Sequence, residues 1–158
     1  MATVKLNNSR AGQFGGVSPF GNKTSLAFRL QTNASGGAVD ADSSAALESG
    51  DVVDLGLLPA GMRLEDASAF ITTAMTASVT GSLGFKYEDG VDDAAVPQDA
   101  AYFFSAKSLA TAARLRADGS KLVTLPKPAR LILTTGGADN AKASDIKIVV
   151  SGELIGRR

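Results

Sequence analysis

Alternation of apolar and polar side chains is the feature that most constrains the fold of this chain. The clearest case is Val79–Glu88, in which apolar residues take every second position apart from a gap at Gly81. Ser25–Gln31 and Asp145–Leu154 alternate in the same way. A period of two is that of a β-strand with one buried face. The residues expected to be buried are Leu26, Phe28, Leu30, Leu83, Phe85, Ile146, Ile148 and Val150.

Further strand candidates are rich in Val, Ile, Leu and Thr, and turn signals separate them. Long amphipathic segments of the kind that cross over between parallel strands are missing. The length of 158 residues fits one domain with a core of its own. We therefore predict an all-β protein, a jelly-roll-like two-sheet β-sandwich. The additional strands are expected at Val52–Leu58, Met62–Thr72, Lys121–Leu125, Ala129–Thr135 and, as a short strand, Thr3–Leu6.

Ala100–Arg116 combines conflicting preferences. Its Ala, Leu, Lys and Arg residues favour helix, whereas the aromatic run at its start favours strand. We expect a strand near Tyr102–Ala106, followed by an irregular or briefly helical connection.

Three segments have loop composition: Asn7–Lys23, Gly36–Gly50 and Asp89–Asp99. A structureless stretch as long as Asn7–Lys23 is uncommon inside a compact domain. It also contains Phe14 and Phe20, which a simple linker would not need. We interpret residues 1–23 as an extended N-terminal arm and residues 24–158 as the sandwich. The alternative is a loop folded back on its own domain. The partner-binding residues predicted for the arm are Arg10, Phe14, Phe20 and Lys23.

The chain contains neither histidine nor cysteine, which argues against enzymatic catalysis. Without them, Ser-His-Asp, Cys-His and the usual zinc sites are impossible. The acids between Glu88 and Asp99 lack the mid-loop glycine and closing glutamate of a calcium loop. Glu65-Asp66 would face opposite sides of a strand, and Ser105 with Lys107 lacks the Ser-x-x-Lys motif. We predict no catalytic, metal or cofactor site.

Charge is balanced overall but segregated along the chain. Residues 1–37 carry four basic and no acidic side chains, residues 38–99 carry two basic and twelve acidic, and residues 100–158 carry ten basic and four acidic. Such blocks suit complementary contacts between copies, so we expect a dimer or trimer. The neutral balance does not predict nucleic-acid binding. No apolar run is long enough for a membrane span, and the polar N-terminus predicts synthesis in a cytoplasm.

Two segments resemble small virion proteins of tailed bacteriophages. Asp51–Gly90 contains LGLLPAG, a strand leading into a Thr/Ala/Ser-rich stretch, and then SLGF. Pro128–Ile155 begins with PARL and ends in a strand rich in Ile and Val. The resemblance covers somewhat less than half of the chain and excludes Met1–Ser49.

The resemblance implies an auxiliary capsid protein, also called a cement or decoration protein. Such proteins bind the outside of a capsid as oligomers and bridge subunits of the major capsid protein. The implied location is the exterior of the virion.

The alternative is a β-sandwich that binds a receptor or carbohydrate at a virion fibre or spike. Carbohydrate sites usually stack sugars on exposed aromatic rings. The chain has no tryptophan, and its only tyrosines are Tyr87 and Tyr102. The sequence therefore favours the capsid-binding interpretation.

Overall fold

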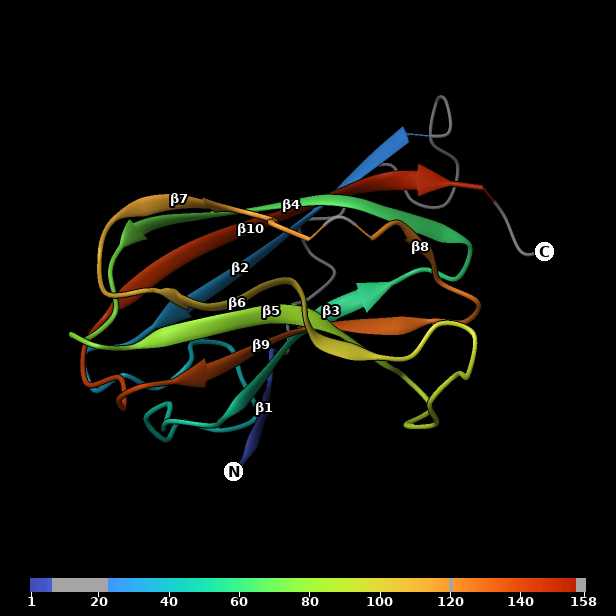
Figure 1. Ribbon diagram of the computed structural model, residues 1–158. Coiled ribbons are helices and arrows are strands. Elements are labelled where there is room, and N and C mark those ends of the chain that lie inside the picture. The colour runs from blue at the N-terminus through green and yellow to red at the C-terminus, as the bar shows by residue number, and fades with distance from the viewer. Residues whose placement is uncertain (7–22, 120, 156–158) are drawn as a thin grey trace.

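A computed structural model describes residues 1–6, 23–119 and 121–155. These residues form two stacked β-sheets and contain no helix (Figure 1). One sheet has the strand order β1-β3-β9-β5-β6, and the other has the order β2-β10-β4-β7, with β8 also paired to β4. The strands are β1 (Thr3–Lys5), β2 (Lys23–Thr32), β3 (Val52–Leu58), β4 (Met62–Thr73), β5 (Thr80–Tyr87), β6 (Asp99–Ser108), β7 (Ala113–Arg116), β8 (Val123–Thr124), β9 (Ala129–Gly136) and β10 (Ser144–Leu154).

Most connections carry the chain from one sheet to the other. Pro59-Ala60-Gly61 joins β3 to β4, and Pro126-Lys127-Pro128 joins β8 to β9. Both proline turns therefore link strands that are not hydrogen-bonded to each other. Within the sheets, paired strands are antiparallel except for β1 and β3. The predicted all-β, jelly-roll-like two-sheet sandwich is confirmed.

The core lies between the sheets, where the alternating apolar faces meet. Seven of the eight residues expected to be buried are there, each no more than 4% exposed. Leu26 of β2 is the exception, because it is only partly buried although it packs against the core. Among the described residues, β2 lies at the edge of its sheet, and this side chain has a neighbouring strand on one side only.

The segment Ala100–Arg116 departs from the prediction in its second half. β6 contains the expected strand, and its register shifts against β5 allow the consecutive side chains of Phe103 and Phe104 both to be buried. The irregular or briefly helical connection expected next was wrong in part, because Ala113–Arg116 forms β7. Pairing with β4 over Ser68–Ile71 overrides the weak helical preference of this alanine-rich segment. The candidate at residues 121–125 is reduced to the two residues of β8.

The first six residues belong to the sandwich. β1 pairs in parallel with β3, and Val4 and Leu6 join the core. The backbone N–H of Ala2 donates to Asp51 Oδ1 at 2.8 Å, which fixes the start of the chain. The short strand expected near Thr3–Leu6 is therefore present as Thr3–Lys5. Residues 7–22, the greater part of the predicted arm, lie outside the described residues.

Candidate interaction surfaces

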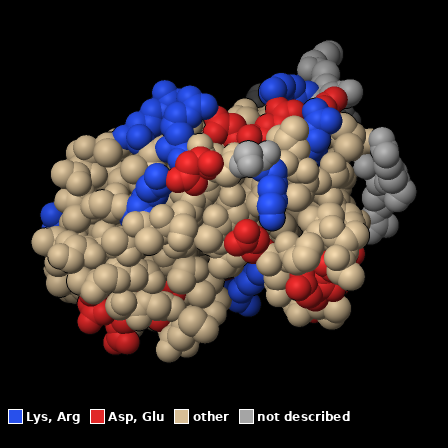
Figure 2. Space-filling model, viewed as in Figure 1, with Lys and Arg blue, Asp and Glu red and all other residues tan. Residues whose placement is uncertain are grey.

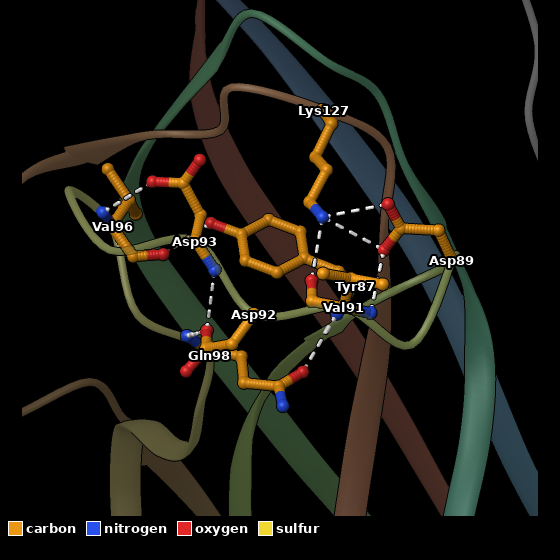
Figure 3. Close-up of polar contacts among 8 residues, drawn as sticks. All are labelled: Tyr87, Asp89, Val91, Asp92, Asp93, Val96, Gln98 and Lys127. Atoms are coloured by element: carbon orange, nitrogen blue, oxygen red, sulfur yellow. Dashed lines mark hydrogen bonds and ion pairs between the residues drawn. The ribbon is translucent and has the colours of Figure 1, made fainter.

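The acidic loop Asp89–Asp99, between β5 and β6, is held by its own carboxylates (Figure 3). Asp92 Oδ1 accepts the backbone N–H groups of Asp93 at 2.9 Å and Gln98 at 2.7 Å. Asp93 Oδ1 accepts that of Val96 at 3.0 Å. Short aspartate side chains commonly bond to nearby backbone in this way. These acids therefore give the loop a defined shape while leaving it negatively charged.

Tyr87 and Lys127 connect the loop to the sandwich (Figure 3). The Tyr87 hydroxyl donates to the carbonyl oxygen of Val96, and the Tyr87 side chain is buried. Lys127 Nζ lies 4.6 Å from the centre of the Tyr87 ring and donates to Asp89 at 2.7 Å and to the Val91 carbonyl at 2.6 Å. Tyr87 thus holds the loop at Val96, and Lys127 holds it at Asp89 and Val91.

This environment changes two pKa values. Hydrogen bonding to Lys127 lowers the pKa of Asp89, which keeps that carboxylate ionised. Burial raises the pKa of Tyr87 to about 12, and the negative charges of Asp93, Asp92 and Asp89 add to the rise. At neutral pH the Asp89 side chain is therefore a carboxylate and Tyr87 keeps its phenolic proton.

Acidic side chains gather at two places along the lower edge of the molecule as drawn in Figure 2. One is the loop Asp89–Asp99, where Val91 also exposes 61% of its surface. The other is the loop that precedes β3, in which Asp40, Asp42 and Glu48 are exposed. Both loops are candidate contact surfaces for a basic partner.

A basic surface lies on the outer face of the other sheet. Strand register aligns Arg29 of β2, Lys147 of β10, Phe70 of β4 and Arg114 of β7 in one row. The Arg114 guanidinium lies 4.8 Å from the centre of the Phe70 ring, a cation–π contact. In Figure 2 the basic side chains over β7 form a continuous blue area. The row could not be seen in the sequence, because it depends on which strands pair.

The charge blocks of the sequence meet within a single chain. Arg130 Nε lies 2.9 Å from Asp54 Oδ1, and Asp54 is buried. Lys127 with Asp89 also joins the acidic block to the basic C-terminal block. Part of the segregated charge thus stabilises this fold, and the exposed remainder forms the acidic loops and the basic row.

Of the residues predicted to bind a partner through the arm, only Lys23 is described. It begins β2, its side chain is 74% exposed, and its Nζ lies 2.6 Å from Glu65 Oε2. Arg10, Phe14 and Phe20 lie outside the described residues.

The two acids considered for catalysis, Glu65 and Asp66, both form ion pairs with basic side chains. Glu65 contacts Lys23 and Arg63, and Asp66 contacts Arg116. Within the described ranges, no three acidic side chains are arranged to hold a metal ion. The same residues include no helix that could cross a membrane.

Comparison with known proteins gives structural matches only. No protein-family model matches the sequence, and no curated protein matches it. A chain from the capsid of Ralstonia phage GP4 superposes with a TM-score of 0.68 and 15% identity, over 98% of this chain and 99% of that chain. This protein has the fold of that capsid chain. A chain from the capsid asymmetric unit of cyanophage Pam1 gives a TM-score of 0.57 and 15% identity, over 94% of this chain and 97% of that chain.

Proposed function

We propose that this protein is a structural component of a phage capsid. The observation that carries the proposal is the likeness to the Ralstonia phage GP4 capsid chain, which extends over nearly the whole of both chains. A shared local motif would match only part of each chain. Here the sandwich and its loops match together.

Within the capsid, we propose the role of a cement protein that binds the outer surface and bridges neighbouring major capsid subunits. The acidic loops and the basic row suit this role, because they lie on different parts of the surface and can engage more than one neighbour. Many modest contacts repeated over a shell add up through multivalency. Self-association, as a dimer or trimer, belongs to the same proposal.

The predicted arm completes this proposal. Residues 7–22 would extend across a neighbouring subunit, with Phe14 and Phe20 as apolar anchors and Arg10 beside acidic side chains. Aromatic residues buried at an interface typically contribute about 2 kcal/mol or more each when truncated. No part of the role requires catalysis, a cofactor, nucleic acid or a membrane.

The alternative of a carbohydrate-binding module gains no support from the two tyrosines. Tyr87 is buried, and the Tyr102 hydroxyl donates to the carbonyl oxygens of Leu64 and Lys121. Neither ring forms an open platform for stacking a sugar.

Imaging of particles assembled with and without this protein tests the proposed role. We expect complete shells in both samples, with extra outer density and slower heat disruption when the protein is present. A reagent that cannot enter the capsid should label the exposed Lys142 on intact particles. Failure of any shell to form without the protein would contradict the cement role and favour a major capsid role. Absence of the protein from particles would contradict both.

A further inference from the structure

We propose that β2 pairs with β2 of a second copy in an antiparallel arrangement, joining two sheets into one continuous sheet across a twofold axis. This inference deepens the self-association in the proposed function by naming the surface and the partner. It rests on the strand edge and not on the charge blocks.

β2 is the longest regular strand edge among the described residues. It is ten residues long, lies at the end of its sheet, and pairs with β10 without a register shift. The other edge strands are less suited to a partner. β1, β7 and β8 have between two and four residues, and β6 has register shifts and a positive φ of 46° at Ala106. Proteins normally protect a long, regular edge.

The charged side chains of β2 do not block this edge. Arg29 donates to Asp145 on β10 from Nε at 2.9 Å and from Nη2 at 2.6 Å, so its guanidinium turns toward the sheet. Lys23 reaches across to Glu65 of β4. The strand also contains no proline. β2 therefore has no proline or bulge along its edge, and its two charged side chains are engaged by acids of its own sheet.

Hydrogen bonds at the end of β2 show which residues face the open edge. The Gln31 carbonyl accepts from Val39 at 2.9 Å, and the Asn33 N–H donates to the Gly37 carbonyl at 2.8 Å, both on the side away from β10. In an antiparallel strand, successive residues direct their backbone groups to opposite sides. Since β2 has no register shift, Ser25, Ala27 and Arg29 direct their N–H and C=O groups to the open edge.

The side chains select a register centred on Ala27. That register places Ser25 opposite Arg29 of the second copy, and Leu26 opposite its Phe28. A shift of one position toward the N-terminus, to a centre at Leu26, would place the like charges of Lys23 and Arg29 opposite each other. A shift of one position toward the C-terminus would pair Phe28, already buried in its own core, with itself, and a shift of two positions would pair Arg29 with itself. The chosen register also covers Leu26, the expected core residue that a single copy leaves partly exposed.

Single cysteines test this register cleanly, because the chain has no cysteine of its own. Two copies of Ala27 would face each other as a hydrogen-bonded pair with Cα atoms about 5.5 Å apart, within the range of a disulfide. Two copies of Ser25 would lie four positions apart, about 13 Å along the strands. Under mild oxidation, the Ala27→Cys variant should form a linked dimer about tenfold or more faster than the matched Ser25→Cys control.

Sedimentation of proline and threonine variants gives a second test. Ala27→Pro removes an N–H group that faces the open edge and spares the pairing with β10, so it should give a folded monomer. Ala27→Thr keeps that group and should remain a dimer. A wild-type protein that stays monomeric at high concentration would overturn the proposal, as would equal or reversed crosslinking of the two cysteine variants. The crosslinking result does not depend on whether the proline variant folds.

These measurements use purified protein, so they are separate from binding to capsids. Crosslinking at Ala27 in a protein that particles never take up would leave this inference standing and contradict the proposed function. Uptake by particles as a monomer would do the reverse.

Discussion

Phe85 shows how much a single buried side chain contributes to the core. It is 1% exposed, and its ring meets Tyr87 and Tyr102 edge-on at centroid distances of 5.9 Å and 5.5 Å. Phe85→Ala should lower the free energy of unfolding by about 3–5 kcal/mol, because it removes a buried ring and leaves a cavity. Denaturant unfolding measures the loss. Phe70→Ala, at a partly exposed ring on the outer face, is the control and should cost clearly less. Equal losses would contradict this account of the core.

The tyrosines predict how stability depends on alkaline pH. Burial raises the pKa of Tyr87 to about 12 and also raises that of Tyr102, whereas a tyrosine in an unfolded chain ionises near pH 10. Between these values the folded state holds more protons than the unfolded state. The tyrosine contribution to stability is therefore complete below about pH 10 and is lost as pH rises toward about 12.

Ultraviolet absorbance of tyrosinate checks this pH prediction. A Tyr102→Phe variant leaves Tyr87 as the only tyrosine, so its titration can be assigned. We expect tyrosinate to appear together with unfolding or near pH 12. A full transition near pH 10 in protein that remains folded would contradict the buried position of Tyr87.

At the scale of elements, Gly137 determines how the chain leaves β9. Its φ is +78°, and a Cβ atom there would lie 2.1 Å from the carbonyl oxygen of Ser78. Gly90, in the acidic loop, has a similar φ of +73° with open space around it. Gly90→Ala should therefore cost about 1–2 kcal/mol of left-handed strain, and Gly137→Ala a further ~1–3 kcal/mol from the collision. Thermal or denaturant unfolding of both variants measures the two losses of stability. Equal losses would contradict the close approach of Ser78 to Gly137.

Local sequence patterns predicted the strands well but not how they pair. The alternation in Val79–Glu88 and the composition of Val52–Leu58 depend on one strand and its buried face, so they could be interpreted without the fold. β7 could not be predicted in this way, because Ala113–Arg116 becomes a strand by pairing with β4. The partial exposure of Leu26 and the row that includes Arg114 likewise depend on strand order. The basic row is therefore a product of the topology, whereas most of the core and the acidic loop Asp89–Asp99 were visible in the sequence.

For the whole molecule, zero net charge conceals an uneven distribution. The acidic loops lie at the lower left and lower right of the molecule in Figure 2, and the basic row occupies the outer face of the β2-β10-β4-β7 sheet. Such an arrangement orients a protein as it approaches a charged shell, and salt weakens that effect. Attachment to a capsid should accordingly combine salt-sensitive steering with contacts that salt does not remove. The proposed apolar anchors, Phe14 and Phe20, would supply the second kind.

β1 belongs to the sandwich, so the anchors have to be tested without removing it. Deleting residues 1–23 would remove Val4 and Leu6 from the core as well as the arm, so a loss of binding would not be specific. Replacing residues 7–22 with a Gly/Ser linker of equal length keeps β1 and β2 intact. This variant should unfold at the same denaturant concentration as the wild type, yet dissociate from capsids sooner on dilution or heating. The expected weakening is about 2 kcal/mol or more for each aromatic anchor lost.

A double variant, Phe14→Ser with Phe20→Ser, separates the anchors from the rest of the segment. It should reproduce most of the loss seen with the linker, whereas Arg10→Ser should mainly change the salt dependence of attachment. Capsid pelleting at low and high salt measures both effects. Unchanged affinity in the linker variant would disprove the arm. Weakening in the linker variant without weakening in the double variant would place the contact elsewhere in residues 7–22. In either case the sandwich could still attach through its acidic loops and basic row, which charge substitutions at Asp92 and Arg114 would then test.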